Sequence, residues 1–363
     1  MTPGFHRPVP AGVLFALLAA VLFGASTPFS KTILREVNPI MLAGLLYLSA
    51  GIGLILWRWL RLWLGADVPR EANLKRTDLP WLACAILAGG IIGPVLLMIG
   101  LAQTPASTAS LLLNLEGVFT ALLAWFIFKE NFDYRIALGM SAITAGGLFL
   151  AWTGKPEVGV PRAALAIAGA CLAWGIDNNL TRKVSATDPL QISAAKGLVA
   201  GGVNLIVAIA MGAEIPGVHI LMISAVLGLL SYGVSLSLFV MALRHLGTAR
   251  TGAYFSLAPF VGVTISIVIL GDRVTLPFLV ATTLMGFGVW LHLTESHEHE
   301  HWHAPIMHDH KHFHDGHHQH EHDGDVPTDE SHSHPHAHAG MLHRHPHYPD
   351  IHHRHSRNSS SEE

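Results

Sequence analysis

The chain of 363 residues has few charged side chains for its length. Only 13% of its residues are Asp, Glu, Lys or Arg, whereas soluble domains average about 25%. Of the 25 acidic residues, 13 lie at or beyond Glu295, so the part before this position is poorer still in charge. This part is too apolar for a water-soluble globule. Its many Gly and Ala residues suit helices that pack closely in lipid.

Several motifs that mark other classes of protein are also missing. No basic stripe with interleaved aromatic residues is present, which argues against a nucleic-acid partner. The sequence contains no P-loop, no G-x-S-x-G elbow and no H-E-x-x-H motif, and therefore gives no support to an ATP-driven pump or to an enzyme. The two cysteines, Cys84 and Cys171, lie in apolar runs. We expect both to be buried small hydrophobic residues rather than a disulfide or a metal pair.

Long apolar runs are what the sequence has in abundance. A helix needs about 20 apolar residues to cross a bilayer, and a helix satisfies its own backbone polar groups there. Such runs occupy residues 11–30, 39–60, 80–101, 106–128, 134–152, 162–181, 189–211, 218–243, 248–270 and 275–293. The predicted fold class is therefore an all-α integral membrane protein with ten transmembrane helices. Its partners would be membrane lipids and a small-molecule or metal-ion substrate, and the sequence leaves a homodimer open.

The loops predict how these spans are oriented. If the N-terminus is cytoplasmic, twelve Lys and Arg residues of the loops and span ends lie inside and five lie outside. An excess of positive charge in cytoplasmic loops is the rule for membrane proteins. We therefore expect both termini in the cytoplasm and a multi-pass location, in a bacterial inner membrane.

The ten spans form two copies of five. The stretch ALLAAVLFGASTPFSK at 16–31 is similar to AIAGACLAWGIDNNLTRK at 166–183, and residues 115–119 line up with 257–261. Because five is odd, the second copy must enter the membrane the other way up. Inverted repeats are typical of secondary transporters whose substrate site lies near the midplane, between the halves. The predicted units are residues 1–152 and 153–294 for the two repeats and residues 295–363 for a tail.

Two strings within these copies carry a resemblance to a known family. AQTPASTASLLLNLEGVFTALLAWFIFKENF at 102–132 and ALRHLGTARTGAYFSLAPFVGVTISIVILGDRV at 242–274 resemble the EamA family of the drug/metabolite transporter superfamily. The resemblance covers about residues 11–293 and implies ten helices, cytoplasmic termini and alternating access. It does not define the substrate, because this family moves amino acids, metabolites, drugs and ions. Where the family commonly has Pro after the Glu of span four, this chain has Gly117, so we expect span four to bend less than span nine, which keeps Pro259.

Ionisable and polar residues inside the predicted spans are the candidates for the transport pathway, because each is costly to place in lipid. Glu116 lies near the middle of span four beside Asn114. In a dry site this carboxyl group could exchange a proton during transport or ligate a cation; alternatively, it only hydrogen-bonds a neighbouring helix. Lys196, one-third into span seven, is expected to pair with Asp177 or Glu116, with contact to a substrate anion or snorkelling as alternatives.

Span six carries three oxygen-bearing side chains in a row, Asp177, Asn178 and Asn179. They cannot all face one direction, because successive residues of a helix turn by about 100°. At least one therefore points toward another helix or a cavity. A break of the helix at Gly175 would add carbonyl ligands for a cation. The alternative is that these residues meet water at the cytoplasmic end of the span.

From Ser296 onward the composition changes, and 22 of the 26 histidines lie between His297 and His355. Few large aliphatic residues accompany them, so we expect this tail to be disordered. The histidines recur at every second position, and imidazole suits Ni²⁺, Co²⁺, Zn²⁺ and Cu²⁺. The transporter needs no cofactor, but the tail is expected to bind such ions. The candidate ligands are His297, His299, His301, His303, His308, His310, His312, His314, His317, His318, His320, His322, His332, His334, His336 and His338.

Three functions follow from these two parts. The first is a secondary transporter that exports divalent metal ions, with the cytoplasmic tail as metal buffer or sensor. The second keeps the transporter but exports an amino acid or other small metabolite, with the tail as a metal-responsive regulator. The third is a membrane-anchored metal sensor or store that moves nothing.

The tail gives a direct prediction. The purified full-length chain should bind several Ni²⁺ or Zn²⁺ ions at pH 7.5, and binding should weaken as the pH falls through about 6.5, because only the neutral imidazole is a ligand. Titration calorimetry in detergent measures this, with the chain truncated after residue 294 as the control. Equal metal binding by the truncated chain would show that the tail is not the metal-binding segment.

Overall fold

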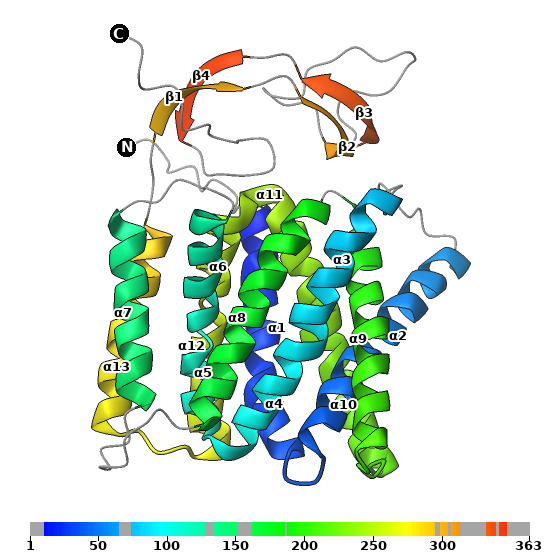
Figure 1. The fold of residues 1–363 in the computed structure, drawn as a ribbon, viewed down its shortest axis with the longest axis vertical. Coiled ribbons are helices and arrows are strands. Elements are labelled where there is room, and N and C mark those ends of the chain that lie inside the picture. The colour runs from blue at the N-terminus through cyan, green and yellow to red at the C-terminus, as the bar shows by residue number, and fades with distance from the viewer. Residues whose placement is uncertain are drawn as a thin grey trace, which may run out of the picture.

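The structure is a computed structural model that describes residues 11–64, 74–127, 134–151, 162–185, 187–294, 298–303, 306–312, 332–338 and 341–346. The first five of these ranges are almost entirely helical (Figure 1). The first copy contains α1 (Ala11–Ile33), α2 (Pro39–Trp63), a short 3-10 turn (Arg76–Asp78), α3 (Leu79–Ala85), α4 (Gly93–Gln103), α5 (Ala106–Leu112), α6 (Leu115–Phe126) and α7 (Tyr134–Ala151). The second contains α8 (Arg162–Val184), α9 (Pro189–Ala210), α10 (Val218–Gly228), α11 (Ser235–Phe255), α12 (Ala258–Leu270) and α13 (Leu276–Leu293).

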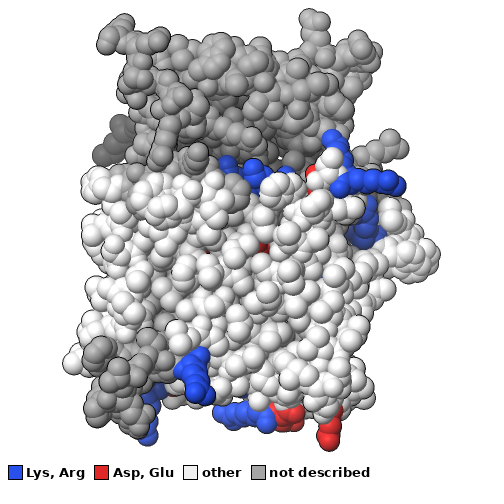
Figure 2. Space-filling model, viewed as in Figure 1, with Lys and Arg blue, Asp and Glu red and all other residues white. Residues whose placement is uncertain are grey.

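These helices have the length and surface of membrane spans. Within the described residues, seven helical stretches are long and apolar enough to cross a membrane, and Ala137–Leu150 and Leu276–Leu291 are shorter apolar helices. Large apolar side chains stay exposed on the outside, as with Val268 at 76% and Ile206 at 69%. Figure 2 shows Lys and Arg gathered toward the two ends of the molecule, with a band between them that has few charged atoms on the visible surface. Together with α8, which carries the polar residues of span six, these helices confirm the predicted fold class.

Helix packing repeats between the two copies. Helix α1 packs against α11 and α12, and its counterpart α8 packs in the same way against α4 and α6, which are the counterparts of α11 and α12. Two further pairs join equivalent helices to each other: α2 with α9 and α7 with α13. Exchanging the two copies leaves these contacts unchanged, as expected for a duplicated unit with an approximate two-fold axis.

The third span of each copy contains a π-helical segment. Residues Ile86–Ile92 join α3 to α4, and residues Leu229–Val234 join α10 to α11. In Figure 1, α3 lies above α4, whereas α10 lies below α11, so the two equivalent spans run in opposite directions. Segments of this kind are rare and concentrate at functional sites. Because the two segments lie at equivalent positions of the two copies, they mark the middle of the bundle as a candidate functional region.

Spans four and nine are both interrupted at the same point of the repeat. Helix α5 ends at Leu112 and α6 begins at Leu115, while α11 ends at Phe255 and α12 begins at Ala258. Both spans are therefore interrupted here, and the expectation that span four bends less than span nine stays a prediction. The break lies before the position of Gly117 and Pro259, so it does not depend on the missing proline.

Glycines bring helices α2 and α9 into backbone contact. A Cβ atom added at Gly197 would lie 2.5 Å from the backbone nitrogen of Gly51, and one added at Gly201 would lie 2.2 Å from the backbone nitrogen of Leu48. In lipid, helices gain no hydrophobic driving force from association, so close packing of small residues must hold them together. This contact holds the second span of one copy against the second span of the other.

One expectation needs correction. Cys84, expected to be buried, is exposed on α3; an apolar run in a membrane protein can face lipid as well as the interior. Within the tail the structure describes four short strands, β1 (Glu298–His303), β2 (Ile306–His312), β3 (His332–His338) and β4 (Met341–Pro346), and the rest of this segment, predicted to be disordered, lies outside the described residues. Alternating histidines fit the period of a strand, and strand pairing through backbone hydrogen bonds needs no apolar face.

The glycine contact yields a prediction with a matched control. Gly201→Ala should lower the stability of the protein by about 1–3 kcal/mol, because the added methyl group meets backbone that cannot rotate away. Gly202→Ala should leave stability nearly unchanged, because a Cβ there would have no neighbour within 4 Å. Thermal unfolding of the two variants in the same detergent measures the difference. Equal melting temperatures would show that α2 and α9 are not packed as closely as described.

Candidate functional site

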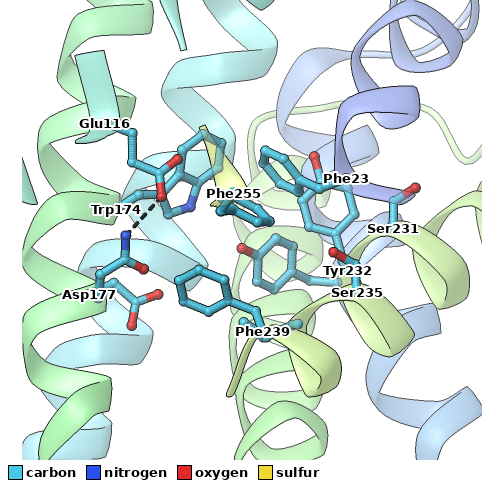
Figure 3. A pocket seen from close by; sticks show the side chains of 12 residues that line it. Phe23, Glu116, Trp174, Asp177, Ser231, Tyr232, Ser235, Phe239 and Phe255 are labelled. Atoms are coloured by element: carbon cyan, nitrogen blue, oxygen red, sulfur yellow. Dashed lines mark hydrogen bonds between the residues drawn. The ribbon is translucent and has the colours of Figure 1, made fainter. Parts of the chain in front are cut away.

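A pocket lies in the middle of the helical bundle, between the two copies (Figure 3). The space between its lining residues, which includes space open to solvent, is about 470 Å³. Helices α1, α2 and α6 of the first copy contribute side chains, as do α8, the second π-helical segment and α11 of the second. The lining residues are Phe23, Tyr47, Glu116, Trp174, Asp177, Asn178, Ser231, Tyr232, Ser235, Leu236, Phe239 and Phe255.

Helix α8 supplies the polar side of this pocket. It is continuous from Arg162 to Val184, so the break considered at Gly175 does not occur. Its three consecutive polar residues point in different directions, as the 100° rotation requires. Asn179 donates to the carbonyl oxygens of Thr120 and Gly175 at 3.1 and 2.9 Å. Asp177 and Asn178 both line the pocket.

Asp177 is held by a buried ion pair with Lys196. The ammonium group of Lys196 donates to Asp177 Oδ1 and to Thr181 Oγ1, the latter at 2.7 Å. Thr181 Oγ1 in turn donates to Asp177 Oδ1 at 2.7 Å. Lys196 is 1% exposed and does not line the pocket. Of the two carboxylates considered as its partner, the structure pairs it with Asp177, and the two charges compensate each other.

Glu116 is the second carboxylate of the pocket, and its partner is an amide rather than a cation. Asn178 Nδ2 donates to Glu116 Oε1 at 2.8 Å and to Thr120 Oγ1 at 3.3 Å. Glu116 comes from α6 of the first copy and Asn178 from α8 of the second, so this hydrogen bond joins the halves (Figure 3). Among the twelve lining residues none is Lys, Arg or His. Among the lining side chains that the structure describes, Glu116 is therefore the carboxyl group without a basic partner.

Aromatic rings form most of the remaining wall. Phe23 lies at the centre of this group, with ring centroids 5.7 Å from Trp174 and Tyr232 and 5.3 Å from Phe255. The Phe239 ring lies 4.8 Å from Phe255, and the Tyr47 ring lies 5.1 Å from Tyr232. Such edge and tilted contacts stabilise rings against each other and fix their orientation.

The first π-helical segment orients two of these rings. The carbonyl oxygen of Gly89 accepts hydrogen bonds from Tyr47 Oη at 2.9 Å and from Trp174 Nε1 at 2.8 Å. A Cβ atom at Gly89 would clash with Asp177 Oδ2, 1.9 Å away. The glycine thus allows the carboxylate of α8 to approach the backbone of span three. The irregular helix, the rings and Asp177 form one connected structure.

The structure brings together some of the predicted pathway residues and not others. Glu116, Asp177 and Asn178 line the pocket. Asn114 does not; it is 2% exposed, and its Nδ2 donates to the carbonyl oxygen of Leu111 at 3.1 Å. Lys196 lies behind Asp177, as described above. The aromatic wall is not evident from the sequence, because the sequence gives no sign of which apolar residues point inward.

The predicted metal ligands of the tail lie either on its strands or outside the described residues. Ten lie on β1, β2 and β3, where the backbone alone is described, and the other six lie outside the described residues: His297, His314, His317, His318, His320 and His322. The backbone register does place histidines opposite one another. The facing pairs are His299 with His345, His301 with His343, His308 with His336, His310 with His334 and His312 with His332. Among the described side chains, no group of three His, Cys, Asp or Glu is placed to hold a metal ion.

The ion pair gives a stability prediction. Lys196→Met should destabilise the protein by about 3–5 kcal/mol, because it leaves Asp177 charged, buried and unpaired. Adding Asp177→Asn to this variant should recover much of the lost stability, since the uncompensated charge is then removed. Thermal unfolding in detergent measures both, with the exposed Lys75→Met as control. A double variant no more stable than Lys196→Met would contradict the proposed origin of the effect.

Comparisons with known proteins agree with this architecture. The chain matches the EamA-like transporter family over residues 10–152 and 161–294, one match for each half. It is 28% identical over 293 residues to an uncharacterized transporter of Methanothermobacter thermautotrophicus, which covers 77% of this chain and 85% of the relative. A solved crystal structure that covers 78% of this chain and 97% of its own superposes with a TM-score of 0.60 at 16% identity, a likeness of fold. Since the family match spans most of the chain, the protein belongs to the EamA-like transporter family and is a multi-pass membrane protein.

Proposed function

We propose that the protein is a secondary transporter that carries a small organic solute through the pocket between its two halves. The observation that carries this proposal is the pocket itself, in which Glu116 of one copy meets Asp177 and Asn178 of the other beside a wall of aromatic rings. Apolar and aromatic walls with a few convergent polar groups are the common form of small-molecule sites. The family assignment supports transport as the activity, and the pocket is the proposed substrate site.

The duplicated architecture supports alternating access as the mechanism. The two halves meet at the pocket and are related by an inverted repeat, so rocking one against the other would open it to either side in turn. The Asn178–Glu116 hydrogen bond crosses this boundary. Protonation of Glu116, or occupation by a substrate, would weaken or replace this bond. Glu116 is thus the group through which a bound proton or solute would affect the contact between the halves.

The histidine-rich tail supports a second role, in metal binding. Cross-strand pairing of histidines along both β-ribbons places potential ligands near one another along the backbone. If the protein lies in a bacterial inner membrane with both termini on the cytoplasmic side, the tail would bind Ni²⁺, Co²⁺, Zn²⁺ or Cu²⁺ from the cytoplasm. We propose that it regulates export of an organic solute according to metal supply.

Export of the metal itself is the second candidate function, and the tail alone favours it. The tail would then raise the metal concentration at the entrance of the pathway. The pocket offers no His or Cys among its twelve lining residues, and one of its two carboxylates is neutralised by Lys196. This donor set suits a transition-metal ion poorly. A metal sensor or store without transport is the third candidate.

The central prediction concerns Glu116. In sealed vesicles containing the purified protein, uptake should be found for at least one member of a panel of labelled amino acids, amines and other metabolites. Glu116→Gln should reduce that uptake at least about tenfold, because it removes the one carboxyl group of the lining without a basic partner. Glu36→Gln, an exposed change in the loop between α1 and α2, is the matched control.

Three outcomes would contradict the proposal. Undiminished transport by a folded Glu116→Gln variant would show that the pocket is not the pathway. Transport of Ni²⁺ or Zn²⁺ without any organic solute, tested in the same vesicles, would establish the metal as cargo. Metal binding without movement of any solute would favour the sensor.

A further inference from the structure

We infer that the solute of this pocket is a small organic cation with a single positive charge and a flat apolar body. Its charged group would lie against Glu116, and its body would lie among the rings of Phe23, Trp174 and Phe239. The inference rests on the proposed function only in taking this pocket as the substrate site. It goes further by assigning the charge and shape of the substrate.

The sign of the charge follows from the pairing of the buried ionisable groups. Lys196 is satisfied by Asp177 and Thr181 and stands behind the pocket wall. Its charge and that of Asp177 cancel. Glu116 is left with an amide partner, so an ionised pocket carries one net negative charge. A single positive charge on the ligand makes the occupied site neutral, which is the state that a low-dielectric interior favours.

An anionic ligand would bind unfavourably in this pocket. No lining residue whose side chain the structure describes is Lys, Arg or His, and the buried ammonium group of Lys196 is already engaged by two oxygen acceptors. Binding an anion would require breaking the Lys196–Asp177 pair and leaving Asp177 buried without a counter-charge. Breaking one side of a buried pair is strongly unfavourable. The pocket therefore selects against carboxylates and phosphates.

The shape of the substrate follows from the aromatic wall. Six of the twelve lining residues are Phe, Tyr or Trp, and their mutual contacts hold the rings in fixed orientations. The faces of such rings attract an organic cation, and more strongly when water is excluded. Figure 3 shows Glu116 and Asp177 on one side of the pocket and Phe23 and Tyr232 on the other. A cation with an apolar body can contact both sides at once.

A set of three probes that differ mainly in charge tests this inference. Benzyltrimethylammonium is the cation, neopentylbenzene is its uncharged carbon analogue, and phenylacetate is an aromatic anion. Binding to the purified full-length protein in detergent is measured by calorimetry or by equilibrium dialysis of labelled probe. The cation should bind at one site per chain and at least about tenfold more tightly than either of the others. Equal or tighter binding of the neutral or anionic probe overturns the inference, as does the absence of cation binding.

Two variants locate the site. Glu116→Gln should weaken binding of the cation at least about tenfold and leave the neutral probe unchanged, whereas Phe239→Leu should weaken both. Glu36→Gln should change neither. Thermal unfolding of each variant shows that it is folded. Cation binding that survives Glu116→Gln would place the cation elsewhere and would also overturn the inference.

The test also separates this inference from the proposed function. Transport of a neutral or anionic solute in vesicles, abolished by Glu116→Gln, would keep the proposed function and refute the cationic substrate. Selective binding of the cation in the pocket, with no transport of any solute, would keep the assignment of the site and refute the transporter.

Discussion

Lipid cannot satisfy a polar group, and the rest of this structure depends on that constraint. Every backbone amide in the membrane must bond within its own helix or to a neighbouring side chain. Where a helix departs from regular geometry, as in residues Ile86–Ile92, side chains complete the bonding, and the Gly89 carbonyl accepts from both Tyr47 and Trp174. Buried charge follows the same rule, since Lys196 and Asp177 neutralise each other. The polar groups that lipid forces together are the ones that form the pocket.

The two copies share their packing but divide the chemistry between them. Glu116 in the first copy aligns with Ala258 in the second, so one half alone supplies this carboxyl group. Span six supplies Asp177 and Asn178, whereas span one has Ser26 and Thr27 at the equivalent places. Phe23 aligns with Trp174, so both spans contribute an aromatic ring to the wall. Duplication thus gives a near-symmetric frame for two-way opening, and divergence places a single asymmetric site at its centre. An asymmetric solute requires such a site.

The tail and the membrane part contain different kinds of binding group, so each suits a different class of ligand. Alternating histidines along strands form a chain of borderline ligands suited to transition metals. The pocket combines one carboxyl group that lacks a basic partner in the lining with aromatic faces, a combination suited to an organic cation. The tail suits a transition-metal ion and the pocket suits an organic cation, so one cargo does not match both. Metal-dependent control of organic-solute movement accounts for each part with its own chemistry.

The sequence by itself determined the helical fold, because apolar runs of about 20 residues have one stable structure in lipid. It also determined the duplication, which the symmetric helix contacts reproduce, and it singled out Glu116, Asp177 and Lys196 through the cost of placing such groups in lipid. Tertiary structure alone decided which of these meet: Asp177 faces Lys196, and Asn178 rather than a cation faces Glu116. It also selected the aromatic wall from among many apolar residues. In a membrane protein the inside and the outside are both apolar, so hydrophobicity cannot tell a ring that lines a pocket from one that faces lipid.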